Sequence, residues 1–286
     1  MSDIPTSGKA LIIYKKSAYD LMRASTDPAD QKALVDSWNT LDMLKKVGAH
    51  DRQAAALKKT QFILQKQGFT VRSVYRADTT LEDIAWADIV VPCGGDGTVL
   101  EASHYIGKTP VLAVNLDPKT SYGAWCATDA DGLESLFANP ANYFMYAAPR
   151  MQASINGRDV RERGLNNILV RHPTDGTMRY VMTVDGVVFT DNKDSGVMIS
   201  TAKGGPGWMT KVGGIPMHIY DRRLQIKNRE TDHDVGGFGE HIQIVSSLRK
   251  ACVVIDTEYV VHELGYNEVL TIKQGQPLNI YLPKKN

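Results

Sequence analysis

Val91-Pro-Cys-Gly-Gly-Asp-Gly-Thr-Val-Leu-Glu-Ala102 is the stretch of this chain in which three glycines surround a single aspartate. Residues 87–91, which lead into it, are mostly apolar and typical of a buried strand, and residues 99–106 have the apolar spacing of a helix. A loop that leaves a strand and opens a helix presents unpaired backbone N–H groups at the positive end of the helix dipole. Because glycines leave the backbone bare, we expect a phosphate to bind closely to this loop.

Asp96 is an unusual residue for a site that binds only an anion, because its negative charge would repel a phosphate. No lysine follows the last glycine, so the loop differs from the Gly-Lys-Ser/Thr phosphate loop, and its spacing differs from the Gly-x-Gly-x-x-Gly dinucleotide motif. Asp96 fits a site of phosphoryl transfer, where it would accept the proton of the attacking hydroxyl or help to hold Mg²⁺. The alternative is a tight turn in which Asp96 caps the helix and Thr98 follows it.

The first half of the chain, on both sides of this loop, alternates between strand-like and helix-like stretches. A helix is expected at residues 51–67, and strands are expected at residues 10–14, 70–76, 87–91 and 110–114. A strand, a loop, a helix and a second strand in close succession imply a parallel sheet with right-handed crossovers. The expected fold class is therefore an α/β domain with a parallel, Rossmann-like sheet.

The second half of the chain consists mostly of short β-rich runs, and Asp185-Gly186 between two of them is a strong signal for a tight hairpin. We expect an α/β phosphate-binding domain over residues 1–145 and a β-rich domain over residues 146–286, with the active site between them. The last ~20 residues are candidates for a return to the first domain. The β-rich runs are residues 151–155, 165–171, 178–184, 187–190, 197–201, 241–245, 251–255, 269–273 and 278–282.

The composition excludes several classes of protein. The formal net charge of +1 gives no strongly basic surface for nucleic acid, and no apolar stretch reaches the ~20 residues that a membrane helix needs. The three cysteines are odd in number and far apart, which indicates reduced thiols and a cytoplasmic protein. The cysteines and histidines lack the paired spacing of a structural zinc site, and Asp232-His-Asp234 is expected to be a solvated loop rather than a metal site.

Four stretches together resemble the NAD kinase family. Gly94-Gly-Asp-Gly-Thr98 is similar to the signature that NAD kinases share with diacylglycerol and sphingosine kinases and, in part, with phosphofructokinases. Pro110-Val-Leu-Ala-Val-Asn-Leu-Asp-Pro118 resembles the strand of NAD kinases that follows the signature, in the form found in the mitochondrial-type branch. Leu165-Asn-Asn-Ile-Leu-Val170 resembles their Leu-Asn-Glu-Val strand, and Ser195-Gly-Val-Met-Ile-Ser-Thr201 resembles their Asp-Gly-Leu-Ile-Ile-Ser-Thr segment. The second Gly-Thr-Gly-Asn-Asp element of the lipid kinases is absent from the sequence.

The resemblance implies an enzyme that transfers the γ-phosphate of ATP, with Mg²⁺, to the 2′-hydroxyl of the adenosine ribose of NAD, giving NADP. It also implies that the second domain binds NAD and takes part in a dimer or larger homo-oligomer. Asp96 would engage the 2′-hydroxyl and act as the base. The other residues that the resemblance assigns to the phosphates and the nucleotide are Gly94, Gly95, Gly97, Thr98, Asn115, Asn166, Asn167, Ser200, Thr201 and Lys203, with Ser200 and Thr201 near the adenosine.

Two departures from the family pattern leave alternatives open. Asn167 stands where the family has a glutamate, and Lys203-Gly-Gly-Pro-Gly-Trp208 stands where the family usually has Thr-Gly-Ser-Thr-Ala-Tyr. Hydroxyl side chains that would bond a ribose are thereby replaced, and Lys203 brings a positive charge that would suit a phosphate. The alternatives are a kinase on the same scaffold that acts on another hydroxyl, of a lipid or a sugar, and an NAD(P)-binding relative without catalysis.

Overall fold

The chain divides into two units in the computed structural model, which describes residues 4–25, 27–38, 40–174, 176–230 and 236–284. One unit comprises Met1–Tyr146 and Asn279–Asn286, and the other comprises Ala147–Leu278. The sequence placed a boundary near residue 145. Asp232-His-Asp234, expected to form a solvated loop, lies outside the described residues.

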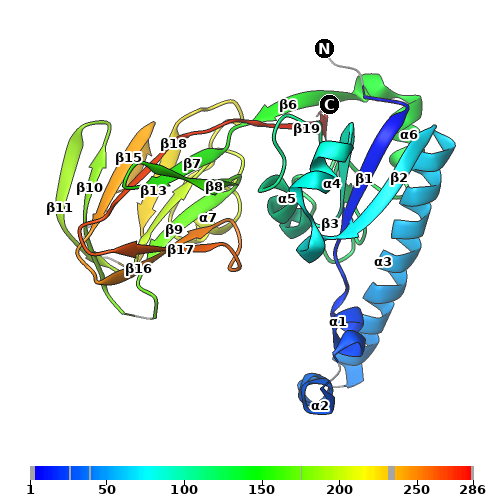
Figure 1. The fold of residues 1–286 in the computed structure, drawn as a ribbon, viewed down its shortest axis with the longest axis horizontal. Coiled ribbons are helices and arrows are strands. Elements are labelled where there is room, and N and C mark those ends of the chain that lie inside the picture. The colour runs from blue at the N-terminus through cyan, green and yellow to red at the C-terminus, as the bar shows by residue number, and fades with distance from the viewer. Residues whose placement is uncertain (1–3, 26, 39, 175, 231–235, 285–286) are drawn as a thin grey trace. The chain divides into compact units, whose positions relative to one another are not determined.

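The first unit is built on a five-stranded parallel sheet with the strand order β2-β1-β3-β4-β5 (Figure 1). Helices α3 and α6 pack on one face of this sheet, and α4 and α5 lie on the other (Figure 1). The strands are β1 (Gly8–Tyr14), β2 (Phe69–Tyr75), β3 (Ile89–Gly94), β4 (Val114–Asn115) and β5 (Thr128–Asp129). The helices are α1 (Ala18–Ala24), α2 (Pro28–Asp36), α3 (Thr40–Lys66), η1 (Arg76–Asp78), α4 (Leu81–Trp86), α5 (Asp96–Ser103), α6 (Leu133–Ala138) and η2 (Pro140–Asn142).

The strand order fixes where a ligand can bind. The chain leaves β1 for β2 on one side and returns to β3 on the other, so the gap between β1 and β3 is a topological switch point. Tyr14 is in register with Tyr75 of β2 and with Cys93 of β3. In open parallel sheets, ligands bind at the carboxyl ends of the strands on both sides of such a point. The glycine loop directly follows β3 and therefore lies at this edge of the sheet.

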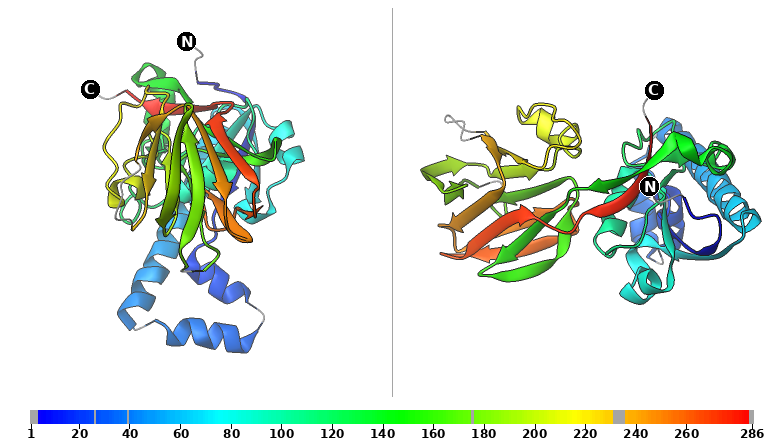
Figure 2. Two further views of the ribbon diagram at one scale, coloured as in Figure 1. Left: turned by 90° about the vertical axis from the view of Figure 1, so that its left-hand side faces the viewer. Right: turned by 90° about the horizontal axis from the view of Figure 1, so that it is seen from above.

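Helix α3 is longer than the helix expected at residues 51–67. Only its second half packs into the core, through the buried residues Thr60, Ile63 and Leu64, which is the part whose apolar spacing the sequence displays. Figure 2 shows that α1, α2 and the first turns of α3 extend beyond the sheet of this unit. Among the described residues, no helix has both the length and the apolar surface that crossing a membrane would demand.

The strand expected at residues 110–114 is present only in part, because β4 is limited to Val114–Asn115. Val111 instead forms single bridges to Val90 on one side and to Ile280 on the other. Ile280 belongs to β19 (Leu278–Pro283), which pairs with β6 (Tyr143–Ala148). A segment from the end of the chain thus completes the first unit.

The second unit is a sandwich of two six-stranded antiparallel sheets, with the strand orders β11-β10-β15-β18-β7-β8 and β14-β13-β12-β9-β16-β17. Buried aliphatic residues of both sheets form one shared core. The expected hairpin is confirmed, because Asp185 and Gly186 have φ angles of 47° and 88° between the paired residues Val184 and Val187. The elements are β7 (Met151–Ile155), β8 (Arg158–Gly164), β9 (Asn167–Arg171), β10 (Met178–Val184), β11 (Val187–Asp194), β12 (Val197–Ser200), α7 (Trp208–Lys211), β13 (Leu224–Asn228), β14 (Gly237–Gly239), β15 (His241–Ser246), β16 (Lys250–Ile255), β17 (Val261–Gly265) and β18 (Val269–Gln274).

Candidate functional site

The glycine loop joins β3 to α5, as the sequence indicated. Gly95 is the N-cap of α5, and no side chain caps the helix, so Asp96 is its first residue and not its cap. The alternative of an ordinary Asp-capped turn is therefore wrong. The carboxylate of Asp96 is free for a different set of contacts.

Those contacts are backbone N–H groups from a distant part of the chain. One oxygen of the Asp96 carboxylate accepts a hydrogen bond from the N–H of Trp125 at 2.8 Å, and the other accepts one from the N–H of Ala124 at 3.1 Å. Asp96 is half-buried. Because each carboxylate oxygen offers about two lone-pair positions, one on each oxygen is left to accept a further donor, such as a hydroxyl. The two bonds hold the carboxylate in a fixed orientation.

The loop that supplies these N–H groups is organised by Asn115 and Asp117. The Asn115 side chain donates to the carbonyl of Ser121 and accepts from the N–H of Asp117, so its amide is used within the loop. The Arg52 guanidinium donates two hydrogen bonds to the Asp117 carboxylate, each at 3.0 Å. Burial acts to raise the pKa of Asp117, but the hydrogen bonds from Arg52 and Thr120 outweigh it and hold the pKa below its ordinary value. The sequence offered no signal for this pairing, because Arg52 and Asp117 lie 65 residues apart.

The glycines of the loop serve two different purposes. A Cβ on Gly94 would collide with the side chain of Thr98, which is only 1% exposed, and a Cβ on Gly95 would collide with the hydroxyl of Ser121. Gly97, by contrast, is exposed, and a Cβ there would meet no atom within 4 Å. Close packing of the protein's own chain therefore explains Gly94 and Gly95, and only Gly97 borders open space into which a ligand could fit.

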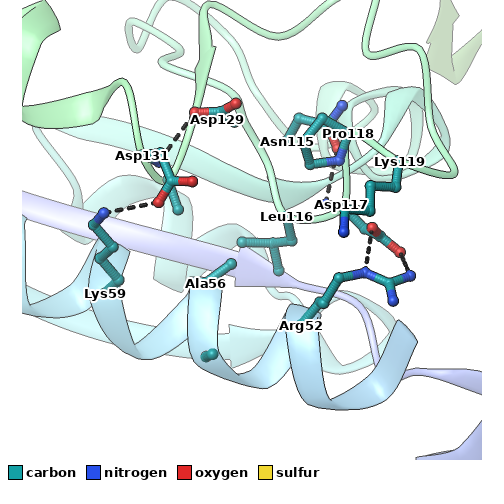
Figure 3. A pocket seen from close by; sticks show the side chains of 12 residues that line it. Arg52, Ala56, Lys59, Asn115, Leu116, Asp117, Pro118, Lys119, Asp129 and Asp131 are labelled. Atoms are coloured by element: carbon teal, nitrogen blue, oxygen red, sulfur yellow. Dashed lines mark hydrogen bonds and ion pairs between the residues drawn. The ribbon is translucent and has the colours of Figure 1, made fainter. Parts of the chain in front are cut away.

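A pocket of about 290 Å³ lies between α3 and the loop that follows β4 (Figure 3). Ala56 and Leu116 line its apolar part, and its rim carries the Arg52–Asp117 pair and an ion pair of 2.8 Å between Lys59 and Asp131 (Figure 3). Asp96 does not line this pocket. Four of the charged residues that line it thus form two ion pairs.

The residues expected at the nucleotide from the second unit lie close to one another. Asn167 of β9 is in register with Ser200 of β12, and Asn166 directly precedes β9. The Ser200 hydroxyl donates to the carbonyls of Asn166 and Thr201, and the Thr201 hydroxyl donates to the carbonyl of Leu165 at 2.7 Å. These hydroxyls therefore position the backbone. Their expected contact with adenosine stays a prediction.

Gly204 and Lys203 follow in the turn after β12. A Cβ on Gly204 would overlap the backbone of Asn166, so only glycine allows this turn to approach β9 so closely. The Thr201 hydroxyl accepts the N–H of Gly204 at 3.1 Å. Lys203 is half-buried in the same turn. The expected roles of Asn166, Asn167 and Lys203 at a nucleotide also stay predictions.

Asp256 is a residue of this neighbourhood that the sequence did not single out. Its carboxylate accepts hydrogen bonds from the backbone N–H groups of Leu165 (2.6 Å), Asn166 (2.7 Å) and Asn167 (2.9 Å). Burial of the carboxyl group raises its pKa to about 7, against the opposing effect of the three donors and of the Arg150 charge. Asp256 also has a positive φ of 57°. It anchors the bend that carries Asn166 and Asn167.

Comparisons with known proteins agree with this arrangement. No protein-family model matches the chain. A rice protein (Oryza sativa subsp. japonica) named a probable NADH kinase is 28% identical over 257 residues, which cover 78% of this chain and 79% of the rice protein. The mitochondrial NAD kinase 2 of Xenopus tropicalis is 43% identical over 65 residues, or 22% of this chain and 15% of that protein. The structure of an NAD kinase from Archaeoglobus fulgidus in complex with ATP has a TM-score of 0.64 at 17% identity, over 96% of this chain and 93% of that chain. The resemblance to NAD kinases that the glycine loop and three further stretches indicated is therefore confirmed, and the chain has their two-domain fold.

Proposed function

We propose that this protein is an NAD kinase, which transfers the γ-phosphate of ATP to the 2′-hydroxyl of the adenosine ribose of NAD and yields NADP and ADP. The observation that carries the proposal is the Asp96 carboxylate, fixed by two backbone N–H donors at the first turn of α5. The relatives of this chain that are named as NAD or NADH kinases support NAD as the acceptor. The structure of the A. fulgidus enzyme in complex with ATP supports ATP as the donor.

The chemistry follows from the position of Asp96. Its carboxylate would accept the proton of the 2′-hydroxyl while the hydroxyl oxygen bonds to the γ-phosphorus, and the bond from that phosphorus to the bridging oxygen of ADP breaks. The backbone at the start of α5 and the bare edge at Gly97 would receive the phosphate oxygens. The proton passes from Asp96 to solvent, so each turnover releases NADP, ADP and one proton.

Mg²⁺ fits this proposal as an ion that enters with the phosphates of ATP. In the part of the chain that the structure describes, no three His, Cys, Asp or Glu side chains are grouped to hold a metal ion. When bound, the ion would neutralise phosphate charge. A cytoplasmic location, a homo-oligomer and an active site between the two units stay predictions.

The deciding assay measures NADP formation from NAD with ATP and Mg²⁺, with polyphosphate as an alternative donor and NADH as an alternative acceptor. NADP and ADP formed in equal amounts would support the proposal. Transfer of labelled phosphate to a lipid or sugar, but not to NAD, would replace it with another kinase on the same scaffold. NAD binding with no transfer to any acceptor would show a binding protein, in line with the changes at Asn167 and in residues 203–208.

Substitutions of Gly97 and Gly94 are expected to distinguish a glycine that leaves room for a ligand from a glycine that leaves room for the protein's own side chains. Gly97→Ala adds a methyl group in open space, so the free energy of unfolding should stay unchanged or rise by up to about 1 kcal/mol. NADP formation should nevertheless fall by about 10-fold or more, because the methyl group occupies space that the phosphate needs. Gly94→Ala presses a methyl group against Thr98 and should cost about 1–3 kcal/mol of stability. Urea unfolding and the NADP assay test both variants. Full activity of Gly97→Ala would show that the phosphate does not bind against Gly97.

A further inference from the structure

The glycine loop lacks the positive charge that phosphoryl transfer requires. Residues 94–98 contain one charged side chain, Asp96, and it is negative. The transferred phosphoryl group carries negative charge on its outer oxygens, and kinases place a cation, often a lysine from a neighbouring element, against those oxygens. Besides an ion that enters with ATP, a cation held by the first unit itself would have to come from an element next to the loop, and β1 is the strand beside β3.

Lys15 occupies the position beside the loop. It directly follows β1, the strand next to β3 at the switch point of the sheet. Tyr14 is in register with Cys93, so the next residues along the two parallel strands, Lys15 after β1 and Gly94 at the end of β3, lie side by side. Lys15 and the glycine loop thus flank the place where open parallel sheets bind their ligands.

The charged groups around Lys15 are engaged with other side chains. Arg76 forms an ion pair of 2.9 Å with Glu101 of α5, and Asp117 is held by Arg52. The ammonium of Lys16 lies 4.3 Å from the centre of the Tyr75 ring. Among the described residues, the half-buried ammonium of Lys15 forms neither a hydrogen bond nor an ion pair.

The charged form of Lys15 is destabilised by its surroundings in the free protein. Burial lowers the pKa of Lys15, and the nearby charge of Arg76 lowers it further, with Asp117 acting weakly in the opposite direction. An ammonium that contributed only to folding would be expected to have a carboxylate or carbonyl partner. An anion that binds at the switch point would supply the missing partner.

We propose that Lys15 binds the phosphate oxygens of the donor nucleotide and provides the positive charge that the glycine loop lacks. This inference rests on the proposed function for its substrate, and it names the donor-binding side chain of the same site. NAD, the acceptor, is not held by Lys15 in this assignment. The substitution of Lys15 should therefore affect the donor and the transfer step and leave acceptor binding unchanged.

The test compares Lys15→Met, which keeps most of the aliphatic stem, with Lys15→Arg and with the matched control Lys16→Met. Lys15→Met is expected to lower kcat/KM for ATP by about 10-fold to 100-fold, the usual effect of losing a hydrogen bond to a charged group. KM for NAD should stay near its wild-type value, Lys15→Arg should restore part of the loss, and Lys16→Met should behave as wild type. The melting temperature of Lys15→Met should not fall, because the removed charge forms no ion pair with any residue that the structure describes.

Binding of inorganic tripolyphosphate, measured by calorimetry, keeps this test separate from the test of the proposed function. If the wild-type protein makes no NADP but binds tripolyphosphate in a Lys15-dependent way, the kinase proposal fails and the phosphate site stands. If the wild-type protein makes NADP and Lys15→Met has unchanged ATP kinetics and tripolyphosphate affinity, the assignment of Lys15 is overturned. A loss confined to KM for NAD would overturn it as well.

Discussion

Asp96→Asn is expected to lower kcat for NADP formation by about 100-fold to 10,000-fold, the range over which a positioned general base contributes. Asparagine has nearly the same shape as aspartate, but it cannot take the proton of the 2′-hydroxyl. It also replaces one acceptor of the Trp125 and Ala124 N–H groups with an NH₂ donor. Part of any effect could therefore come from movement of that loop, and the control must measure this part.

Asp129→Asn provides the control. Asp129 also accepts two backbone N–H groups, those of Asp131 at 3.0 Å and Gly132 at 2.8 Å, and it lies in the same unit but outside the glycine loop. Both N–H groups donate to the same oxygen of Asp129, and asparagine keeps that acceptor, so Asp129→Asn should lose little free energy of unfolding. The larger loss in Asp96→Asn then measures the acceptor that is replaced at Asp96, and only Asp96→Asn should lose turnover. Calorimetric titration with NAD should show that Asp96→Asn still binds the acceptor. Wild-type turnover by Asp96→Asn, or an equal loss of activity in both variants, would contradict the assignment of Asp96 as the base.

Asp256→Ala is expected to lower the free energy of unfolding by about 4 kcal/mol. It leaves three N–H groups, of Leu165, Asn166 and Asn167, without their acceptor, and an unpaired buried donor costs about 1–3 kcal/mol. Alanine is also disfavoured at the positive φ of this residue. Urea unfolding measures the loss. Asp256→Asn should cost clearly less, because asparagine tolerates this φ and keeps one acceptor oxygen; equal losses in the two variants would show that the hydrogen bonds are not the cause.

The same residue should make stability depend on pH. The folded state holds the Asp256 proton up to a pKa of about 7, whereas an unfolded aspartate loses it near its ordinary value of about 4. Between these values the folded state binds more protons, so the contribution of Asp256 to the free energy of unfolding decreases as the pH rises from about 4 to about 7. Urea unfolding at several pH values should show this slope in the wild-type protein and a smaller one in Asp256→Asn.

The sequence was informative where one local pattern determined the structure. The strand, glycine loop and helix around Asp96 and the hairpin at Asp185-Gly186 depend on residues within a few positions of one another, and both are present. The reason why residues 94 and 95 are glycines could not be predicted from the sequence. Gly95 must be small because Ser121 packs against it, and this contact comes from a loop 26 positions away in the sequence, which no local pattern reveals.

Two of the strands that the sequence missed have weak or mixed patterns. β8 (Arg158–Gly164) has one buried aliphatic residue among charged ones because it lies at the edge of its sheet, and β13 (Leu224–Asn228) shows only two aliphatic residues. The residues that hold the candidate site in place could not be predicted for another reason. Arg52 and Asp256 each act on partners 65 to 91 residues away, so their importance depends on the tertiary fold.

The pairing of Val111 with β19 has a consequence for how this protein is made. Val111 donates its N–H to the carbonyl of Asn279 and accepts the N–H of Tyr281, and Tyr281 is almost fully buried. A ribosome synthesises every residue of the β-sandwich before it reaches these positions. The sandwich can therefore fold while the chain is still growing, whereas the α/β unit, although its first strands are made earlier, acquires this buried segment only after the whole sandwich has been synthesised.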